Sequence, residues 1–175
     1  MNRVPVRYRN PQITEETDLE AYEDIHNWLV KPQLNLLLLG APGRGKTYAT
    51  YYLIRELMKR THNDPRLDIR FFRSSDADQR MIEEVRENGT NRCFIHMLSD
   101  VRFLFLDDFG VESSSERMER NYYDLLDQRL SKEYPTVIST NVPLNKFEDL
   151  FGSRIASRLQ EYVTVRFNKG DLRNV

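Results

Sequence analysis

The stretch NLLLLGAPGRGKT, residues 35–47, joins a continuous apolar run to a glycine-rich turn and then to a lysine and a threonine. An uninterrupted apolar run of this length is typical of a strand in a parallel sheet, because such a strand is covered on both faces. The residues that follow, KTYATYYLIRELMKR at 46–60, favour a helix. The stretch therefore predicts a strand, a loop and a helix in succession, the repeating unit of an α/β fold.

The glycine-rich turn matches the pattern G-x-x-x-x-G-K-[ST], with Gly40, Gly45, Lys46 and Thr47 in the required places. Between a strand and a helix, its backbone N–H groups and the helix N-terminus can hold phosphate oxygens. We expect Lys46 to reach the β and γ phosphates of ATP and the Thr47 hydroxyl to bind Mg²⁺. The predicted nucleotide-binding residues are Gly40, Ala41, Pro42, Gly43, Arg44, Gly45, Lys46, Thr47 and Tyr48.

Strand and helix patterns alternate along the rest of the chain. An amphipathic helix is predicted at 19–30, and further strands are predicted at 68–72, 101–106, 136–140 and 162–167. Helical segments are predicted between them at 75–88, 113–131 and around 144–160. Strands that alternate with helices predict a parallel sheet with right-handed crossovers. We therefore predict an α/β, three-layer P-loop NTPase fold with a five-stranded parallel sheet flanked by helices.

Two further polar groups follow predicted strands. LFLDD ends in Asp107 and Asp108 after a largely apolar run, so that Asp107 would help hold Mg²⁺ and Asp108 would act as general base toward water. The next strand ends at Thr140 and Asn141, at the carboxyl edge where ligands of such folds bind. A neutral amide there can sense the γ-phosphate or position the water. Asn141 is the first choice for that role and Thr140 the second.

Other phosphate-loop enzymes fit less well. Asp107 to Gly110 also spells D-x-x-G, and Asn145-Lys146 resembles the guanine-reading N-K-x-D of GTPases, but Glu148 stands where that pattern needs an aspartate. A small-molecule kinase shares the phosphate loop and stays open on motif alone, although its arginines usually lie in a mobile lid of the same subunit.

Composition limits the remaining function classes. The chain has 175 residues and a formal charge of -1, so no global positive field draws it to nucleic acid. Its single cysteine, Cys93, excludes an internal disulfide, argues against a zinc site and is expected to be buried. No window approaches the ~20 apolar residues that span a bilayer, so we expect a cytoplasmic protein without a membrane partner.

The chain resembles the DnaC/DnaI/IstB group of AAA+ ATPases, which are bacterial helicase loaders and transposition helpers. The stretches that carry the resemblance occur in family order across nearly the whole chain. They are VPVRYRN, LLLLGAPGRGKT, FLFLDDFG, LLDQRLSKEYPTVISTNVPL, GSRIASRL and VRFNKGDLR.

The resemblance implies roles for several residues. Asp107 and Asp108 would be the Walker B pair, and Asn141 or its neighbour would be sensor 1. GSRIASRL, residues 152–159, would carry the arginine finger, which acts on ATP held by a neighbouring subunit; Arg158 is the preferred finger and Arg154 the alternative. Arg173 resembles the sensor 2 arginine, which contacts nucleotide within its own subunit. Together these residues imply a homo-oligomer with ATP-bridged interfaces.

The resemblance also implies a DNA partner, but the chain departs from the helicase loaders of this group, which carry an extra N-terminal region that grips the helicase. We expect a tail and helix at 1–33, with no separate helicase-binding domain, and an AAA+ ATPase domain at 34–175 without a helical lid domain. Single-stranded DNA binding is implied by the family, and the candidate segment is Asp76 to Ser99, with Arg80, Arg86, Arg92 and Phe94. The basic side chains there would follow the phosphates and the aromatic one would stack with bases. The acids Glu83, Glu84 and Glu87 share that segment, so a solvated helix is an equal alternative there.

These features predict a minimal AAA+ ATPase that binds ATP and Mg²⁺ and acts in DNA replication, loading or remodelling a replicative helicase on single-stranded DNA. Its turnover as an isolated subunit should be weak, since part of each site would come from a neighbour. Two alternatives stay open. One is an IstB-like transposition helper whose partner is a transposase, and the other is a nucleotide-gated adaptor with negligible turnover.

Overall fold

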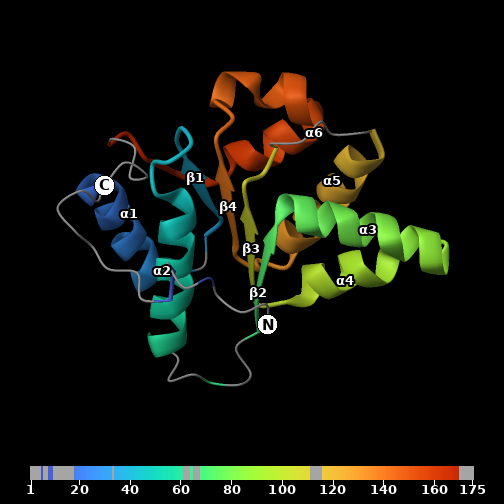
Figure 1. Ribbon diagram of the computed structural model, residues 1–175, viewed down its shortest axis with the longest axis horizontal. Helices are drawn as coiled ribbons and strands as arrows, with labels where there is room; N and C mark the ends of the chain where they lie inside the picture. The colour runs from blue at the N-terminus through green and yellow to red at the C-terminus, as the bar shows by residue number, and fades with distance from the viewer. Residues whose placement is uncertain are drawn as a thin grey trace.

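A five-stranded parallel sheet forms the centre of the molecule (Figure 1). The computed structural model describes residues 5, 8–9, 18–32, 34–60, 64, 68–110 and 116–169. In spatial order, the strands are β2 (Ile69–Arg73), β3 (Phe103–Asp107), β4 (Thr136–Thr140), β1 (Leu36–Leu39) and β5 (Val163–Arg166). All four neighbouring pairs are parallel, so the carboxyl ends of β1, β3 and β4 meet at one edge of the sheet.

Helices cover both faces of this sheet, as Figure 1 shows. One face carries α1 (Leu19–Val30) and α2 (Lys46–Arg60). The other face carries α3 (Ser74–Asn88), α4 (Arg92–Asp100), α5 (Glu116–Ser131) and α6 (Phe147–Gln160), the last preceded by the short 3₁₀ helix η2 (Leu144–Lys146). The structure thus confirms the predicted three-layer α/β fold.

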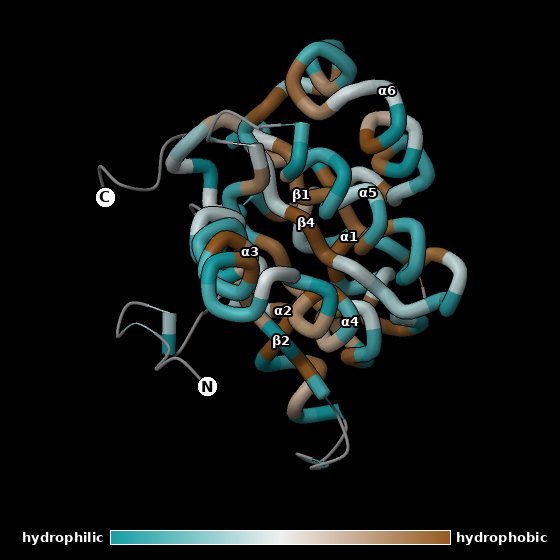
Figure 2. The backbone as a smooth tube through the Cα atoms, turned by 90° about the vertical axis from the view of Figure 1, so that its right-hand side faces the viewer, coloured by the Kyte–Doolittle hydropathy of each residue, from teal (hydrophilic) through white to brown (hydrophobic). Residues whose placement is uncertain are grey.

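The core explains why the strand residues read as continuous apolar runs. Leu36 and Leu38 of β1 pack with α1 and α2, whereas Leu37 packs in the opposite layer with α4, α5 and α6. Figure 2 shows the hydrophobic residues along the central strands and hydrophilic residues on the outer turns of the helices. Because both faces of the sheet are buried, apolar residues are needed at every position of β1.

The helix α4 was not predicted from the sequence. Its buried residues Phe94, Ile95 and Leu98 have the i, i+1, i+4 spacing of a helix, a signal present in the sequence but spread over only nine residues. Cys93, on its outer side, is exposed, so the expectation of a buried thiol was wrong. Within the part of the chain that the structure describes, no helix has the length and apolar character needed to cross a bilayer.

A fully buried arginine, Arg129, ties the second layer to the sheet. Its guanidinium donates to the carbonyl oxygens of Leu98, Val101 and Pro135 at 2.7–2.8 Å, and its Nε donates to the Thr136 hydroxyl at 2.8 Å. Burial lowers its pKa to about 10. These contacts join the C-terminal ends of α4 and α5 to the first residues of β4, opposite the sheet edge described above.

Replacing Arg129 with methionine should lower the free energy of unfolding by at least about 3 kcal/mol, because three buried carbonyl groups lose their donors at ~1 kcal/mol or more each. Urea unfolding followed by circular dichroism measures the change. Arg120→Met, at an exposed position of the same helix, is the matched control and should shift stability by less than about 0.5 kcal/mol. Equal stabilities of the two variants would contradict this role for Arg129.

Candidate nucleotide-binding site

The glycine-rich loop between β1 and α2 adopts a backbone that only some residues tolerate. Gly43 and Gly45 have φ of 82° and 92°, in the left-handed region that disfavours larger residues. Gly40 packs so tightly that a Cβ there would lie 2.7 Å from the Phe167 carbonyl oxygen. The backbone N–H of Gly40 donates to the Thr140 carbonyl at 3.3 Å, which places this loop beside the end of β4.

Lys46, the first residue of α2, folds back over this loop. Its Nζ donates to the carbonyl oxygens of Gly40 and Ala41 at 2.7 and 3.0 Å, and the side chain is only 5% exposed. The ammonium group therefore lies within the curve of the loop, where loops of this pattern hold phosphate. A bound phosphate would offer it stronger, charged acceptors than the two carbonyl groups.

The second residue of α2, Thr47, meets the first residue of the acid pair. The Thr47 hydroxyl donates to Oδ2 of Asp107 at 2.9 Å, so that two oxygens from distant segments are adjacent. Burial raises the pKa of Asp107, and hydrogen bonds from Ser139 and Thr47 act in the opposite direction. A hydroxyl and one carboxylate, completed by phosphate oxygens and water, form a donor set that suits Mg²⁺.

The described residues contain no group of three or more His, Cys, Asp or Glu side chains that could hold a metal ion alone. A cation at Thr47 and Asp107 would thus depend on oxygens supplied by the nucleotide. The observed pair fits that arrangement, because Mg²⁺ in nucleotide sites is usually held by few protein ligands and the substrate phosphates.

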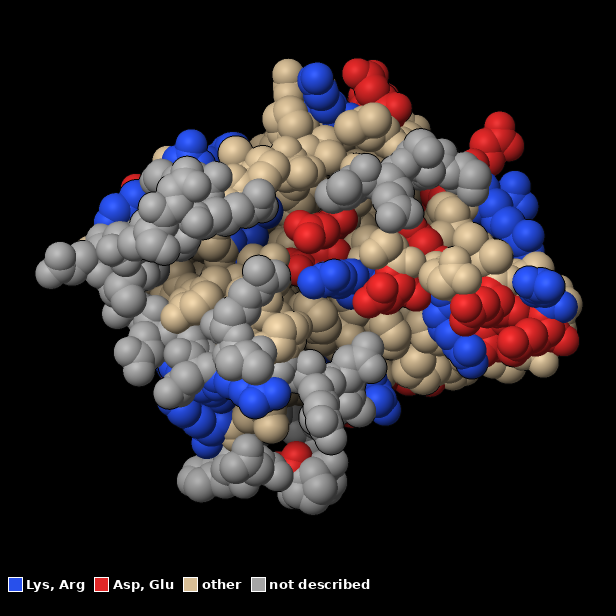
Figure 3. Space-filling model, in the orientation of Figure 1, with Lys and Arg blue, Asp and Glu red and all other residues tan. Residues whose placement is uncertain are grey.

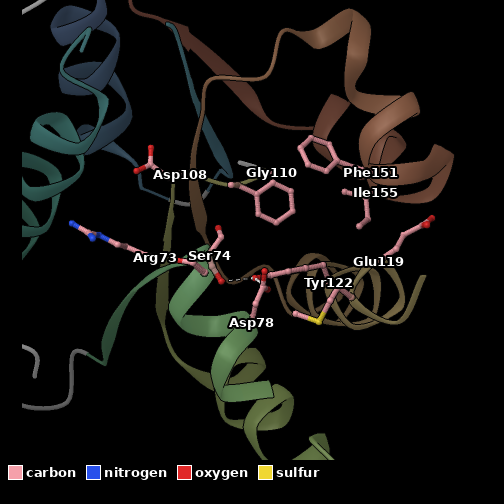
Figure 4. A pocket seen from close by; sticks show the side chains of 12 residues that line it. Arg73, Ser74, Asp78, Asp108, Gly110, Glu119, Tyr122, Phe151 and Ile155 are labelled. Carbon is pink, nitrogen blue, oxygen red and sulfur yellow. Dashed lines mark hydrogen bonds between the residues drawn. The ribbon is translucent and has the colours of Figure 1, made fainter. Parts of the chain in front are cut away.

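Asp108 follows Asp107 but faces a different environment. It has φ of 55°, unusual for a residue with a side chain, and its side chain is exposed whereas that of Asp107 is buried. In Figure 4 its carboxylate points away from Phe151 and Tyr122, toward the side of the sheet where α2 lies. The two acids therefore have separate surroundings, one buried between strands and one open to a ligand.

A cavity of about 170 Å³ lies beyond Asp108, among α3, α5 and α6 (Figure 4). Its lining residues include Arg73, Ser74, Tyr122 and Phe151, and none of them belongs to the glycine-rich loop. The cavity is therefore adjacent to the acid pair but distinct from the phosphate-binding loop.

The end of β4 brings a third polar group to the same edge. Thr140 is fully buried, and its hydroxyl is engaged by the Phe109 carbonyl at 2.7 Å and the Val142 N–H at 3.1 Å. Asn141 is half-buried and directly follows the strand that pairs with β1. Of the two residues predicted to sense phosphate, Asn141 is thus the one whose side chain is open to a ligand.

The two arginines of residues 152–159 lie elsewhere. Gly152 interrupts α6 with φ of 75°, and a Cβ at this glycine would collide with the Glu119 carboxylate, 1.9 Å away. Beyond this kink, the guanidinium carbons of Arg154 and Arg158 lie 5.5 and 5.8 Å from the centre of the Tyr123 ring on α5. Among the described residues, neither arginine forms a hydrogen bond, an ion pair or a cation–π contact with the glycine-rich loop.

Arg158 is also held by acidic groups of its own chain. Its guanidinium forms ion pairs with Asp127 at 2.6 Å and Glu161 at 3.2 Å. Hydrogen bonds to Tyr123, Asp127 and Glu161 raise its pKa. Arg154 is exposed. The preferred finger is therefore engaged within the subunit, whereas its alternative points to solvent over the same tyrosine ring.

Other residues around the glycine-rich loop were not predicted. Arg44 donates to the carbonyl oxygens of Asn168 and Lys169, and the Asp18 carboxylate accepts the N–H groups of these two residues at 2.7 and 3.0 Å. The segment after β5 is thus fixed beside the loop.

Tyr8 packs edge-on against Tyr48, with ring centroids 6.5 Å apart. Arg173 lies outside the described residues.

The segment proposed to contact single-stranded DNA forms α3 and α4. Phe94 is only 7% exposed and packs edge-on against Phe72, so the expectation that it stacks with bases was wrong. Arg80 is paired with Glu83 and Glu84. The sequence of α3 contains five acidic residues and two arginines, and Figure 3 shows both kinds of charge interleaved on this part of the surface. The solvated-helix alternative fits α3 better.

The fold is similar to those of several solved structures. "Crystal structure of the DnaC helicase loader" superposes with a TM-score of 0.77 at 18% identity, covering 94% of this chain and all of that one. "Crystal Structure of the DnaI" gives a TM-score of 0.76 at 18% identity, over 98% of this chain and 95% of that chain. "Replication initiator DnaA bound to AMPPCP and single-stranded DNA" gives 0.78 at 23% identity, over 97% and 52% of the two chains.

Sequence comparison agrees with the fold. The replicative helicase loader DnaC of Escherichia coli (strain K12) is 25% identical over 127 residues, which cover 72% of this chain and 50% of the loader. The chain thus matches about half the length of this curated relative. The family model for the IstB-like ATP binding protein matches residues 19–161, a span that contains the glycine-rich loop, the acid pair and both arginines of α6. The chain therefore belongs to the family of IstB-like ATP-binding proteins.

Proposed function

We propose that this protein is an AAA+ ATPase that hydrolyses MgATP at the sheet edge formed by the glycine-rich loop, Asp107, Asp108 and Asn141. The observation that carries the proposal is the hydrogen bond between Thr47 and Asp107, which joins the loop to the acid pair across the sheet. We propose an ATPase domain at 34–175, preceded by the segment 1–33. The helix α1 of that segment shares a core with α2 and β5.

The residues would divide the reaction as follows. The glycine-rich loop, residues 40–48, would bind the phosphates through backbone N–H groups and the Lys46 ammonium. Arg173 would contact the nucleotide from the C-terminal segment. Thr47 and Asp107 would hold Mg²⁺, which when bound neutralises charge on the phosphate oxygens. Asp108 would accept a proton from the attacking water, and the Asn141 amide would orient that water or the γ-phosphate. Asp108 can approach the water because it is exposed.

The arginines of α6 support a site shared between subunits. Arg154 and Arg158 lie over Tyr123 rather than over the glycine-rich loop, so an arginine finger from this helix would act on a neighbouring molecule. A guanidinium supplied in this way stabilises the charge that develops on the transferring phosphoryl group. Arg158 would have to leave Asp127, which provides a reason for weak turnover by an isolated subunit.

For the biological role, we propose a helicase loader that acts on a replicative DNA helicase and single-stranded DNA as a homo-oligomer. The similarity to the replicative helicase loader DnaC supports this role, as does the fold shared with a DnaA structure containing single-stranded DNA. The IstB-like family model keeps a transposition helper as the second candidate, with a transposase as partner. A nucleotide-gated adaptor with negligible turnover is the third.

Lys46→Ala should weaken ATP binding at least about tenfold and remove hydrolysis, because the loop would lose the charge that contacts the phosphates. Titration with a fluorescent ATP analogue and phosphate release give the two values. Lys59→Ala, at the exposed end of the same helix, is the control and should leave both unchanged. Unchanged nucleotide affinity in Lys46→Ala would refute the assignment of the loop.

Subunit mixing tests the shared site. Arg158→Ala subunits and Asp108→Asn subunits should each be inactive, but an equal mixture should recover about one quarter of the wild-type activity. A quarter is expected because half of the sites are intact and half of those meet an intact arginine across a head-to-tail interface. The same mixture with Arg154→Ala decides which arginine acts. A mixture as inactive as its components, for both arginines, would exclude a site completed in trans.

The partner is tested by affinity capture with the wild-type protein in the presence of ATP, using Lys46→Ala as the nucleotide-free control. Purified replicative helicase and purified transposase are offered in separate reactions. We expect ATP-dependent capture of the helicase alone. Capture of the transposase alone would favour the transposition-helper role. ATP-dependent capture of a partner by a protein without measurable phosphate release would favour the adaptor.

A further inference from the structure

Two buried hydroxyl groups at the end of β4 hold the segment that carries the acid pair. Ser139 and Thr140 are 1% and 0% exposed, and neither hydroxyl faces solvent. Each hydroxyl instead contacts the turn that follows β3, about 30 residues earlier in the chain. We call the turn of residues 107–110 the acid turn.

Ser139 contacts both members of the acid pair. Its hydroxyl donates to Oδ1 of Asp107 at 2.5 Å and accepts the backbone N–H of Asp108 at 3.0 Å. Its carbonyl oxygen accepts the N–H of Phe109 at 2.8 Å. Since Thr47 occupies Oδ2 of Asp107, both oxygens of that carboxylate have fixed partners. Ser139 therefore orients the Asp107 side chain and the Asp108 backbone together.

Thr140 connects the acid turn to Asn141. Its hydroxyl donates to the Phe109 carbonyl at 2.7 Å and accepts the N–H of Val142 at 3.1 Å. Asn141 lies between Thr140 and Val142 in the chain, so this second hydrogen bond spans it. One hydroxyl thus fixes both the position of the acid turn and the path of the chain through Asn141.

The acid turn needs such support because of its backbone. Asp108 has φ of 55° and Gly110 has φ of 81°, both in the left-handed region. A residue with a side chain adopts this region only when the surrounding structure favours it. The N–H of Asp108, the N–H of Phe109 and the carbonyl of Phe109 all bond to Ser139 or Thr140. These bonds favour the left-handed conformation that exposes the Asp108 carboxylate.

We infer that Ser139 and Thr140 are positioning residues for ATP hydrolysis, which hold Asp107, Asp108 and Asn141 in one fixed relative geometry. The inference rests on the proposed ATPase function. Neither hydroxyl touches the nucleotide; each acts through a residue that does. Loss of either bond should therefore lower the rate of the chemical step and leave nucleotide binding by the glycine-rich loop nearly intact.

Thr140 offers a matched pair of variants. Thr140→Val keeps the shape and removes the hydroxyl, whereas Thr140→Ser keeps the hydroxyl. We expect Thr140→Val to lower kcat at least about tenfold, since a small displacement of a catalytic group can cost ~100-fold in rate. The dissociation constant for ATP should change less than about twofold, and Thr140→Ser should retain at least about a third of the wild-type kcat.

Thr136→Val controls for a purely structural effect. Thr136 is a fully buried residue at the other end of the same strand, and its hydroxyl bonds to Arg129 rather than to the acid turn. This variant should lower thermal stability without lowering kcat of the folded protein. A kcat in Thr140→Val equal to that of Thr136→Val would overturn the inference.

Amide hydrogen exchange supplies a readout independent of turnover. In Ser139→Ala the N–H of Asp108 loses its acceptor and should exchange at least about tenfold faster, whereas the N–H of Phe109 keeps its bond to the main-chain carbonyl. Equal protection of the Asp108 amide in wild type and Ser139→Ala would refute the role of Ser139.

The failure of the proposed function and the failure of this inference give different results. Absence of hydrolysis in the wild type itself would overturn the proposed function, and with it the inference. Normal hydrolysis in both Thr140 variants would overturn the inference alone.

Discussion

The structure of this site depends on one buried carboxylate, Asp107, and the bonds that satisfy it. Burying a charged carboxylate is unfavourable unless it is hydrogen-bonded, and its oxygens accept bonds from Thr47 and Ser139. Those partners come from α2 and β4, on either side of β3 in the chain. The need to pair this carboxylate therefore joins three segments at one point. The glycine-rich loop, the acid turn and Asn141 extend from that point toward the same edge of the sheet.

The same edge has a division of roles between buried and exposed groups. Asp107, Ser139 and Thr140 are inaccessible and bond to one another or to the backbone, whereas Asp108 is exposed and Asn141 half-buried. Water and a nucleotide can reach the exposed groups directly, and the buried groups are more rigid because they are packed and fully hydrogen-bonded. The arginines of α6 lie apart from this edge, over Tyr123, which is the arrangement expected if a second subunit completes the site.

Much of the fold followed from local pattern. The apolar run at 36–39 required cover on both faces of the sheet. The alternation of such runs with helical segments indicated the parallel sheet that the structure contains. The short helix α4 was missed because nine residues with three buried apolar positions give a weak periodic signal. Phe94, which was expected to stack with bases, is buried instead, because it packs against Phe72 of a distant strand. The fold could thus be predicted where a segment's own pattern sufficed.

The sequence alone determined the chemistry available at the site: a phosphate-binding loop, two successive acids after a buried strand, and an amide after another. These are local patterns, in which neighbouring residues specify the conformation. Only the tertiary structure decided which hydroxyls hold the acid turn, that Arg158 is paired with Asp127, and that Arg44 and Asp18 fix the segment after β5. The partners in these contacts are 31 to 151 residues apart, and their meeting depends on how the helices and strands pack. No spacing along the chain encodes such a contact, because the distance between two side chains is set by the fold that both belong to.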